Sequence, residues 1–174
     1  MEIRLAGSGG QGIILCSIIL ADAALMGGAY SAQSQSYGPE ARGGACKAEV
    51  VISSEKIDFP KVVKSDFMLA LTQTSLEKYL SGAKPGSILM VDKSLTLPDA
   101  VNEMGLTVYS LPILSAARDS LKRPMVANIV AAGAINACLK LVDMEILEKA
   151  VLNNVPAGTE ELNRFAMVLG SGML

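Results

Sequence analysis

Three glycines near the amino terminus have the spacing of a loop that binds phosphate groups. Gly7, Gly9 and Gly12 satisfy the pattern G-x-G-x-x-G, between a predicted strand at 2–6 and a predicted helix at 11–28. Glycines let such a turn tighten and bring its backbone close to a ligand, and a helix amino terminus offers free N–H groups and the positive end of its dipole. The candidate residues of this glycine loop are Gly7, Ser8, Gly9, Gly10, Gln11 and Gly12.

The residues that follow restrict the ligands that this loop can bind. A dinucleotide loop needs an acidic residue about 20 positions downstream to bind the ribose hydroxyls. The segment AYSAQSQS, 29–36, contains neither an acid nor a base. A P-loop is excluded because no Lys-Ser or Lys-Thr pair follows the glycines. Three interpretations stay open: classical NAD binding, a structural turn without a ligand, and a loop that contacts an anion or a partner protein.

A second candidate contact surface lies in the segment SQSYGPEARGG. An aromatic ring and a charge pair on a loop stiffened by proline are typical of a contact surface; an ordinary hairpin loop with surface charges is the alternative. In the sheet expected below, both loops lie at one end of neighbouring elements and form one site. The candidate residues are Tyr37, Gly38, Pro39, Glu40, Arg42, Gly43 and Gly44.

Size and charge set further bounds. The chain has 174 residues and a net charge of −2, which suits a single domain, 1–174, and gives no reason to expect nucleic acid or an anionic membrane as a partner. The amino terminus lacks the pattern of a signal peptide, and the longest uncharged runs are shorter than the roughly 20 residues that span a bilayer. We expect a cytoplasmic protein with no membrane contact, whose apolar, partner-facing surface makes the lone chain self-associate.

Several kinds of catalytic chemistry are excluded by composition. Histidine is absent, so the chain has no Ser-His-Asp or Cys-His arrangement and no imidazole acid–base group. Cys16, Cys46 and Cys138 form no C-x-x-C pair, so we expect no iron–sulfur cluster held by this chain alone, and no other metal site. Cys16 and Cys138 lie in apolar helical runs and are predicted to be inert core residues. No catalytic residue is predicted.

The segments expected to position the two loops alternate between strands and helices. After the helix at 11–28, which Gly27 and Gly28 end, strands are predicted at 29–37 and 45–53. Asp143 and Thr159 are predicted to cap the last two helices. The remaining predicted segments are a strand at 66–71, a helix at 75–83, a turn at 84–87, a strand at 88–92, a helix at 97–105, a strand at 106–112 and helices at 113–121, 125–142, 143–155 and 158–172.

This order predicts an α/β fold, a three-layer α/β/α sandwich with a single domain. The strands at 29–37 and 45–53 are separated only by a loop, so they should pair antiparallel. The sheet is therefore predicted to be mixed and mainly parallel. The helix at 125–142 is hydrophobic nearly all round, which indicates burial on more than one side.

The two glycine-rich motifs together resemble a known family. AGSGGQGIILCSIILADAALMGG followed by QSQSYGPEARGGACKAEVVIS is similar to the gamma subunit of 2-oxoacid:ferredoxin oxidoreductases, and SYGPEARGG is most similar to the 2-oxoglutarate type. The rest of the chain fits in length and in the order of its elements. The main alternative is a stand-alone nucleotide- or flavin-binding oxidoreductase that uses the Gly7–Gly12 loop; a scaffold without any ligand is a further one.

The resemblance implies a role inside a larger enzyme. The family decarboxylates a 2-oxoacid on thiamine diphosphate with magnesium, passes electrons through [4Fe–4S] clusters to ferredoxin, and hands the acyl group to coenzyme A. The thiamine and cluster sites belong to other subunits, so this chain is expected to bind no cofactor alone and to be inactive when isolated. Its expected partners are the alpha and beta subunits, a delta subunit where one exists, and ferredoxin through the complex.

The resemblance also implies what the two loops do. The gamma subunit completes the assembly and contributes to the coenzyme A side of the site, so the loops are expected to contact coenzyme A or a partner subunit. The N–H groups of the glycine loop and the guanidinium of Arg42 favour an anion, either a coenzyme A phosphate or a partner carboxylate. Glu40 is expected to orient Arg42.

Overall fold

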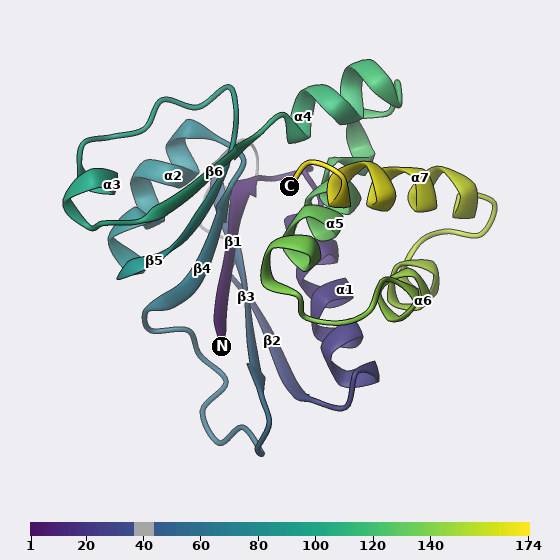
Figure 1. Ribbon diagram of the computed structural model, residues 1–174, viewed down its shortest axis with the longest axis horizontal. Coiled ribbons are helices and arrows are strands. Elements are labelled where there is room, and N and C mark those ends of the chain that lie inside the picture. Colours follow the sequence, from purple (N-terminus) through teal and green to yellow (C-terminus); the bar gives the residue numbers. More distant parts are fainter. Residues whose placement is uncertain (37–43) are drawn as a thin grey trace.

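The computed structural model describes residues 1–36 and 44–174 as a six-stranded sheet with helices on both faces (Figure 1). The strand order is β2-β3-β1-β4-β5-β6. The strands are β1 (Glu2–Ser8), β2 (Tyr30–Ser36), β3 (Ala45–Ser53), β4 (Ser65–Ala70), β5 (Ala83–Asp92) and β6 (Thr107–Leu111).

The helices differ in length and type. The long ones are α1 (Ile13–Met26), α5 (Ala127–Leu139), α6 (Met144–Asn154) and α7 (Glu160–Ser171). The short ones are α2 (Gln73–Tyr79), α3 (Ala100–Glu103) and α4 (Ile113–Ser115), with 3-10 turns η1 (Leu80–Gly82) and η3 (Pro124–Val126) and a π-helical turn η2 (Ala116–Ser120).

The sheet is mixed and mainly parallel, as predicted. β1 pairs with β4, β4 with β5 and β5 with β6 in parallel, whereas β3 is antiparallel to both β1 and β2. The expected antiparallel pairing of β2 with β3 is present along the whole of β2, from Tyr30 opposite Ser53 to Ser36 opposite Lys47. A short connection between consecutive strands makes them pair antiparallel. Parallel neighbours need a longer crossover connection, which is usually a helix.

The two faces of the sheet support cores of unequal size. The larger core lies under α1, α5, α6 and α7, where Leu5, Phe67 and Leu69 of the sheet are fully buried. The smaller one packs α2 and α3 against alternate residues of the same strands, such as Ala6 and Met68. This alternation follows from the two-residue period of a strand, and it gives the predicted three layers.

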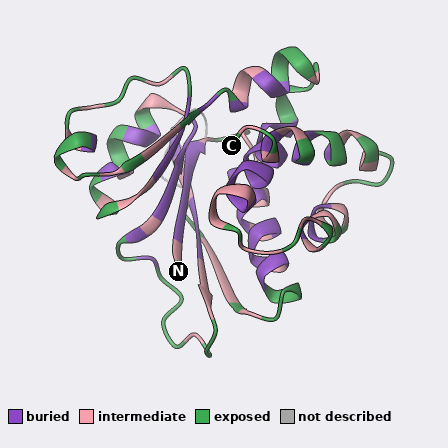
Figure 2. Ribbon diagram, viewed as in Figure 1, coloured by how far each residue is buried: buried purple, intermediate pink, exposed green. Residues whose placement is uncertain are grey.

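Helix α5 is the most enclosed helix of the larger layer. All residues from Ala127 to Asn136 are buried, and Figure 2 shows the helix coloured as buried over most of its length. This confirms the prediction that an apolar run with no polar face is covered on more than one side.

The structure corrects three local predictions. The segment at 84–87 is not a turn between elements, because it lies inside β5. Ser65 of β4 pairs with Ala83, but Phe67 pairs with Ile88, so the extra residues of β5 bulge where Gly86 has φ +76°. The turn-forming residues therefore produce an irregularity within the strand.

The other two corrections concern helix caps. Asp143 and Thr159 occupy the N-cap positions of α6 and α7, but neither side chain accepts a hydrogen bond from a backbone N–H of its helix. The Thr159 hydroxyl instead donates to the carbonyl of Pro156 (2.6 Å) and accepts from the side-chain Nδ2 of Asn163 (2.9 Å). The positions were predicted correctly and the capping interaction was not.

Within the described residues, no helix combines the length and the apolar character needed to cross a membrane.

Candidate functional site

The last residue of the second predicted loop lies beside the glycine loop, at the carboxyl end of β1. The glycine loop follows the carboxyl end of β1, and Ser8 is paired with Ala45 at the start of β3. Gly44, the last residue of the second loop, therefore lies beside the glycine loop. The other candidates of the second loop lie outside the described residues: Tyr37, Gly38, Pro39, Glu40, Arg42 and Gly43.

The carboxyl ends of the parallel strands share this edge. β1, β4, β5 and β6 run in the same direction, so the segments that follow Ala70, Asp92 and Leu111 emerge on the same side as the glycine loop. In open α/β sheets, ligands bind in the crevice outside the carboxyl ends of the strands. The glycine loop therefore occupies the position where this fold class places its ligands.

A folded-back glutamine shapes the first half of the glycine loop. The backbone N–H of Ser8 donates to Oε1 of Gln11 (2.8 Å), and the N–H of Gln11 donates to the carbonyl of Ser8 (3.2 Å). A Cβ at Gly7 would lie 2.6 Å from the same Oε1 atom. Gly7 therefore makes room for Gln11, and Gln11 satisfies a backbone donor of the loop.

The second half of the loop opens helix α1. Gly10 and Gly12 have φ angles of +93° and +70°, in the left-handed region that glycine adopts without strain. Gly12 is the N-cap of α1, no side chain caps this terminus, and the first turn contains no acidic residue. The leading N–H groups of a helix have no intrahelical acceptor, so this end of α1 is left available to an anion.

Asn128, the second residue of α5, lies against this loop, and the sequence pattern did not predict that contact. A Cβ at Gly12 would lie 2.5 Å from Nδ2 of Asn128, so the side-chain amide presses against the loop. Asn128 is 4% exposed, and its Oδ1 accepts the N–H of Ile129 (3.0 Å). The only sequence signal was a polar residue within an apolar run, which does not indicate a contact with residue 12.

Positive charges lie beside the start of β3. The ammonium group of Lys47 is 2.8 Å from Glu49 Oε1, and the Nε of the buried Arg4 is 2.8 Å from the same oxygen. Tyr79 donates its hydroxyl to the carbonyl of Ala45 (3.2 Å), and Lys47 lies 6.0 Å from its ring centre. Two cations thus share one carboxylate on β3, which leaves a net positive charge on this part of the sheet.

The cysteines do not provide a metal site in the described part of the chain. Cys16 is fully buried, and burial raises the pKa of its thiol to about 12. Burial also raises the pKa of Cys46 and of Cys138. Across residues 1–36 and 44–174, no three Cys, Asp or Glu side chains gather as metal ligands would. The described side chains therefore offer no set of cysteine ligands for an iron–sulfur cluster.

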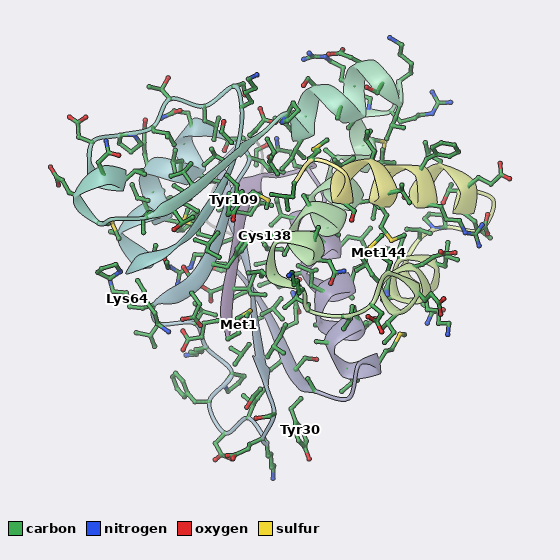
Figure 3. The ribbon with its side chains drawn as sticks, viewed as in Figure 1. Met1, Tyr30, Lys64, Tyr109, Cys138 and Met144 are labelled. Carbon is green, nitrogen blue, oxygen red and sulfur yellow. The ribbon has the colours of Figure 1, made fainter. Side chains whose placement is uncertain are left out.

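The prediction that Cys138 lies in the core was only partly correct. Cys138 is half-buried near the carboxyl end of α5, whereas Cys16 is fully enclosed. Figure 3 shows Cys138 close to Tyr109 of β6, and the hydrogen bond from Tyr109 offsets part of the rise in the Cys138 pKa. The helix ends one residue after Cys138, so its packing is looser there.

Comparison with known proteins places this chain in a family. Residues 2–172 match the model of the pyruvate ferredoxin/flavodoxin oxidoreductase family. The 2-oxoglutarate synthase subunit KorC of Methanocaldococcus jannaschii is 49% identical over 170 residues, which cover 97% of this chain and 91% of that protein.

Two solved structures share the fold. The gamma subunit of a keto/oxoacid ferredoxin oxidoreductase from Geobacter sulfurreducens has a TM-score of 0.87 and 43% identity, and the match covers 99% of this chain and 96% of that one. The 2-oxoglutarate:ferredoxin oxidoreductase from Magnetococcus marinus, solved with 2-oxoglutarate, coenzyme A and succinyl-CoA bound, has a TM-score of 0.88 and 25% identity. This chain matches only 30% of that longer chain.

The chain therefore belongs to the pyruvate ferredoxin/flavodoxin oxidoreductase family. Within the family it is a gamma-type subunit of the 2-oxoacid:ferredoxin oxidoreductases, which confirms the resemblance stated from the two glycine-rich motifs. These relatives give no support to the alternative of a stand-alone nucleotide- or flavin-binding oxidoreductase.

Proposed function

We propose that the chain is the gamma subunit of a 2-oxoglutarate:ferredoxin oxidoreductase. The observation that carries this proposal is the 49% identity, over nearly the whole of both chains, to a 2-oxoglutarate synthase subunit. The complex oxidatively decarboxylates 2-oxoglutarate, releases CO2, transfers the succinyl group to coenzyme A and passes the electrons to ferredoxin. This chain completes the assembly and is inactive alone.

The redox chemistry belongs to other subunits in this proposal. Thiamine diphosphate, magnesium and the [4Fe–4S] clusters sit on the alpha and beta subunits and on a delta subunit where one exists, and ferredoxin meets the complex. The three free cysteines suit the reducing cytoplasm.

The glycine loop contributes to binding coenzyme A. Its N–H groups and the uncapped terminus of α1 attract a phosphate, and a relative was solved with coenzyme A bound. Arg42 supplies a guanidinium that pairs with phosphate, and Glu40 orients it. The proposed contact residues are those of both loops, from Gly7 to Gly12, from Tyr37 to Glu40, and from Arg42 to Gly44, and some of these contact partner subunits.

A pull-down experiment tests the role of the chain. A tagged copy is purified without oxygen from its native host, and the chains that accompany it are identified by mass. The proposal predicts larger thiamine- and cluster-binding subunits and a complex that oxidises 2-oxoglutarate in preference to pyruvate. Repeated recovery of the chain alone under gentle conditions contradicts the assembly role.

The variant Arg42→Lys tests the loop. Lysine keeps the charge but loses the planar fork that pairs with phosphate, so the KM for coenzyme A should rise while the complex still assembles. Arg164→Lys is a matched control, because Arg164 is exposed on α7 and pairs with Glu148. If Arg42→Lys impairs only assembly, the loop is a subunit contact and does not bind coenzyme A.

A further inference from the structure

The amino termini of two long helices converge at the glycine loop. α1 begins after Gly12 and α5 begins at Ala127, and the two helices pack side by side on one face of the sheet (Figure 1). Neither first turn contains an acidic residue, and no side chain caps α1. At α5, the N–H of Ala127 donates to the carbonyl of Pro124 and that of Ile129 to Oδ1 of Asn128, so the free backbone donors at this junction are those of α1. Each terminus carries roughly half a positive charge from its aligned peptide dipoles, so the potential at their junction favours an anion.

The side chain of Asn128 gives this junction a specific donor. Its Oδ1 accepts the N–H of Ile129, which fixes the orientation of the amide. Its Nδ2 donates no hydrogen bond to any residue of the described segments, although Asn128 is only 4% exposed. An amide N–H in a buried side chain is costly without an acceptor, so this donor favours a ligand that supplies one.

The amide nitrogen also keeps access to the loop. In the described part of the chain, Ser87 Oγ is the one fully enclosed side-chain polar atom that lacks a partner, so Nδ2 of Asn128 is not sealed in the core. It faces Gly12, where any Cβ would lie 2.5 Å away. The absence of a side chain at Gly12 therefore makes room for the Asn128 amide, whose donor lies at the first turn of α1.

We infer that Asn128 is a further binding residue of this site and donates its Nδ2–H to the anion held at the amino termini of α1 and α5. This inference rests on the proposed function for the identity of the anion, a phosphate group of coenzyme A. A phosphate oxygen accepts from the amide and from the free N–H groups of α1 at once. A carboxylate of a partner subunit is the competing occupant, and the test separates the two.

The variant Asn128→Asp replaces the donor by a carboxylate of almost the same shape. In the assembled complex we expect the KM and the Kd for coenzyme A to rise at least tenfold. We expect kcat at saturating coenzyme A and the KM for 2-oxoglutarate to stay near their wild-type values. Asn128→Ala, which removes the donor without adding charge, should raise the Kd by a smaller factor and guards against failure of the aspartate variant to fold. Titration calorimetry of the complex without 2-oxoacid gives the Kd independently of turnover.

Asn136→Ser is the matched control. Asn136 is also a buried asparagine of α5, but its Nδ2 donates to the carbonyl of Val142 (3.0 Å) at the other end of the helix. We expect this variant to lower the melting temperature and leave coenzyme A binding unchanged.

The outcomes separate this inference from the proposed function. A wild-type Kd for coenzyme A in both Asn128 variants overturns the inference, and a raised KM in Arg42→Lys then leaves the loop proposal standing. Loss of assembly with an unchanged Kd also overturns it, and assigns the amide to a partner carboxylate. If the Arg42 variant and both Asn128 variants bind coenzyme A normally, coenzyme A binding by these loops fails as well.

Discussion

At the residue scale, the backbone conformation of Gly12 and its contact with Asn128 both require glycine at this position. Its φ of +70° lies in the left-handed region, and a side chain there would meet the amide of Asn128 at 2.5 Å. We expect Gly12→Ala to lower the free energy of unfolding by about 2–4 kcal/mol, as the sum of backbone strain and overpacking. Urea unfolding of the isolated chain measures this change.

Gly105→Ala is the control for Gly12→Ala. Gly105 has a similar φ of +61°, but a Cβ there would meet no atom within 4 Å. Gly105→Ala should lower the free energy of unfolding by about 1 kcal/mol, from backbone strain alone. Equal losses in the two variants would show that the contact with Asn128 does not constrain the loop.

Asp66 links stability to pH. Partial burial raises the pKa of its carboxyl, but the hydrogen bond and charge of Lys84 and the N–H of Glu2 outweigh this, so the pKa lies below its usual value. A lowered folded-state pKa contributes stability above the unfolded value of about 3.9 and loses it as the pH falls through the folded value. Asp66→Asn should therefore cost less than about 1 kcal/mol near neutral pH, since the pair is largely exposed.

The same variant should approach wild-type stability in acid. Once the wild-type carboxyl is protonated, it no longer attracts Lys84, and the difference between the two proteins shrinks. Urea unfolding at neutral and acid pH checks this. A difference in unfolding free energy that is independent of pH would show that the charge of Asp66 contributes nothing.

At the scale of elements, the crossing of α5 and α7 requires two glycines. A Cβ at Gly170 would lie 1.9 Å from the carbonyl oxygen of Val130, and one at Gly133 would lie 2.1 Å from that of Met167. Because both atoms approached are backbone, the helices would have to separate. We expect Gly170→Ala to cost about 3 kcal/mol or more, as severe overpacking does.

Gly172→Ala, at the carboxyl-terminal cap of α7, is the control for the helix crossing. Its Cβ would meet carbonyl oxygens of its own helix at 3.6 and 3.8 Å, which is ordinary contact. The unfolding free energy should change by no more than about 0.5 kcal/mol. A wild-type unfolding curve for Gly170→Ala would contradict the close crossing of the two helices.

Local sequence patterns predicted most elements, and the predictions failed where the structure depends on contacts with other segments. The strand at 45–53 was placed with its observed bounds because alternation and flanking glycines are local signals. The segment at 84–87 was misassigned because a bulge depends on register with β4, which the segment itself does not encode. The caps at Asp143 and Thr159 were placed correctly, but their hydrogen bonds depend on neighbours such as Pro156.

The candidate site was predictable to the same extent. The spacing of Gly7, Gly9 and Gly12 located the loop, and the hairpin topology brought Gly44 beside it. Asn128 was missed because its contact with Gly12 joins residues far apart in the sequence. Local pattern therefore identified the loop, and tertiary packing was needed to identify its neighbour.

At the scale of the whole molecule, the surface is compatible with a subunit of a larger assembly. Phe165 and Val168 of α7 are 70% and 58% exposed, and Met125 is 83% exposed. Exposed apolar side chains of this size favour association when they lie together, so the expected self-association of the lone chain remains a prediction. A gamma subunit should be required by the complete enzyme.

Omission and add-back of this chain tests that requirement most directly. The complex is rebuilt from its separate subunits with and without the chain, and coenzyme A-dependent reduction of ferredoxin is followed with 2-oxoglutarate and with pyruvate. The account predicts activity with 2-oxoglutarate only when the chain is present, restored by adding it back. Full 2-oxoglutarate activity without the chain would contradict its proposed role as the gamma subunit.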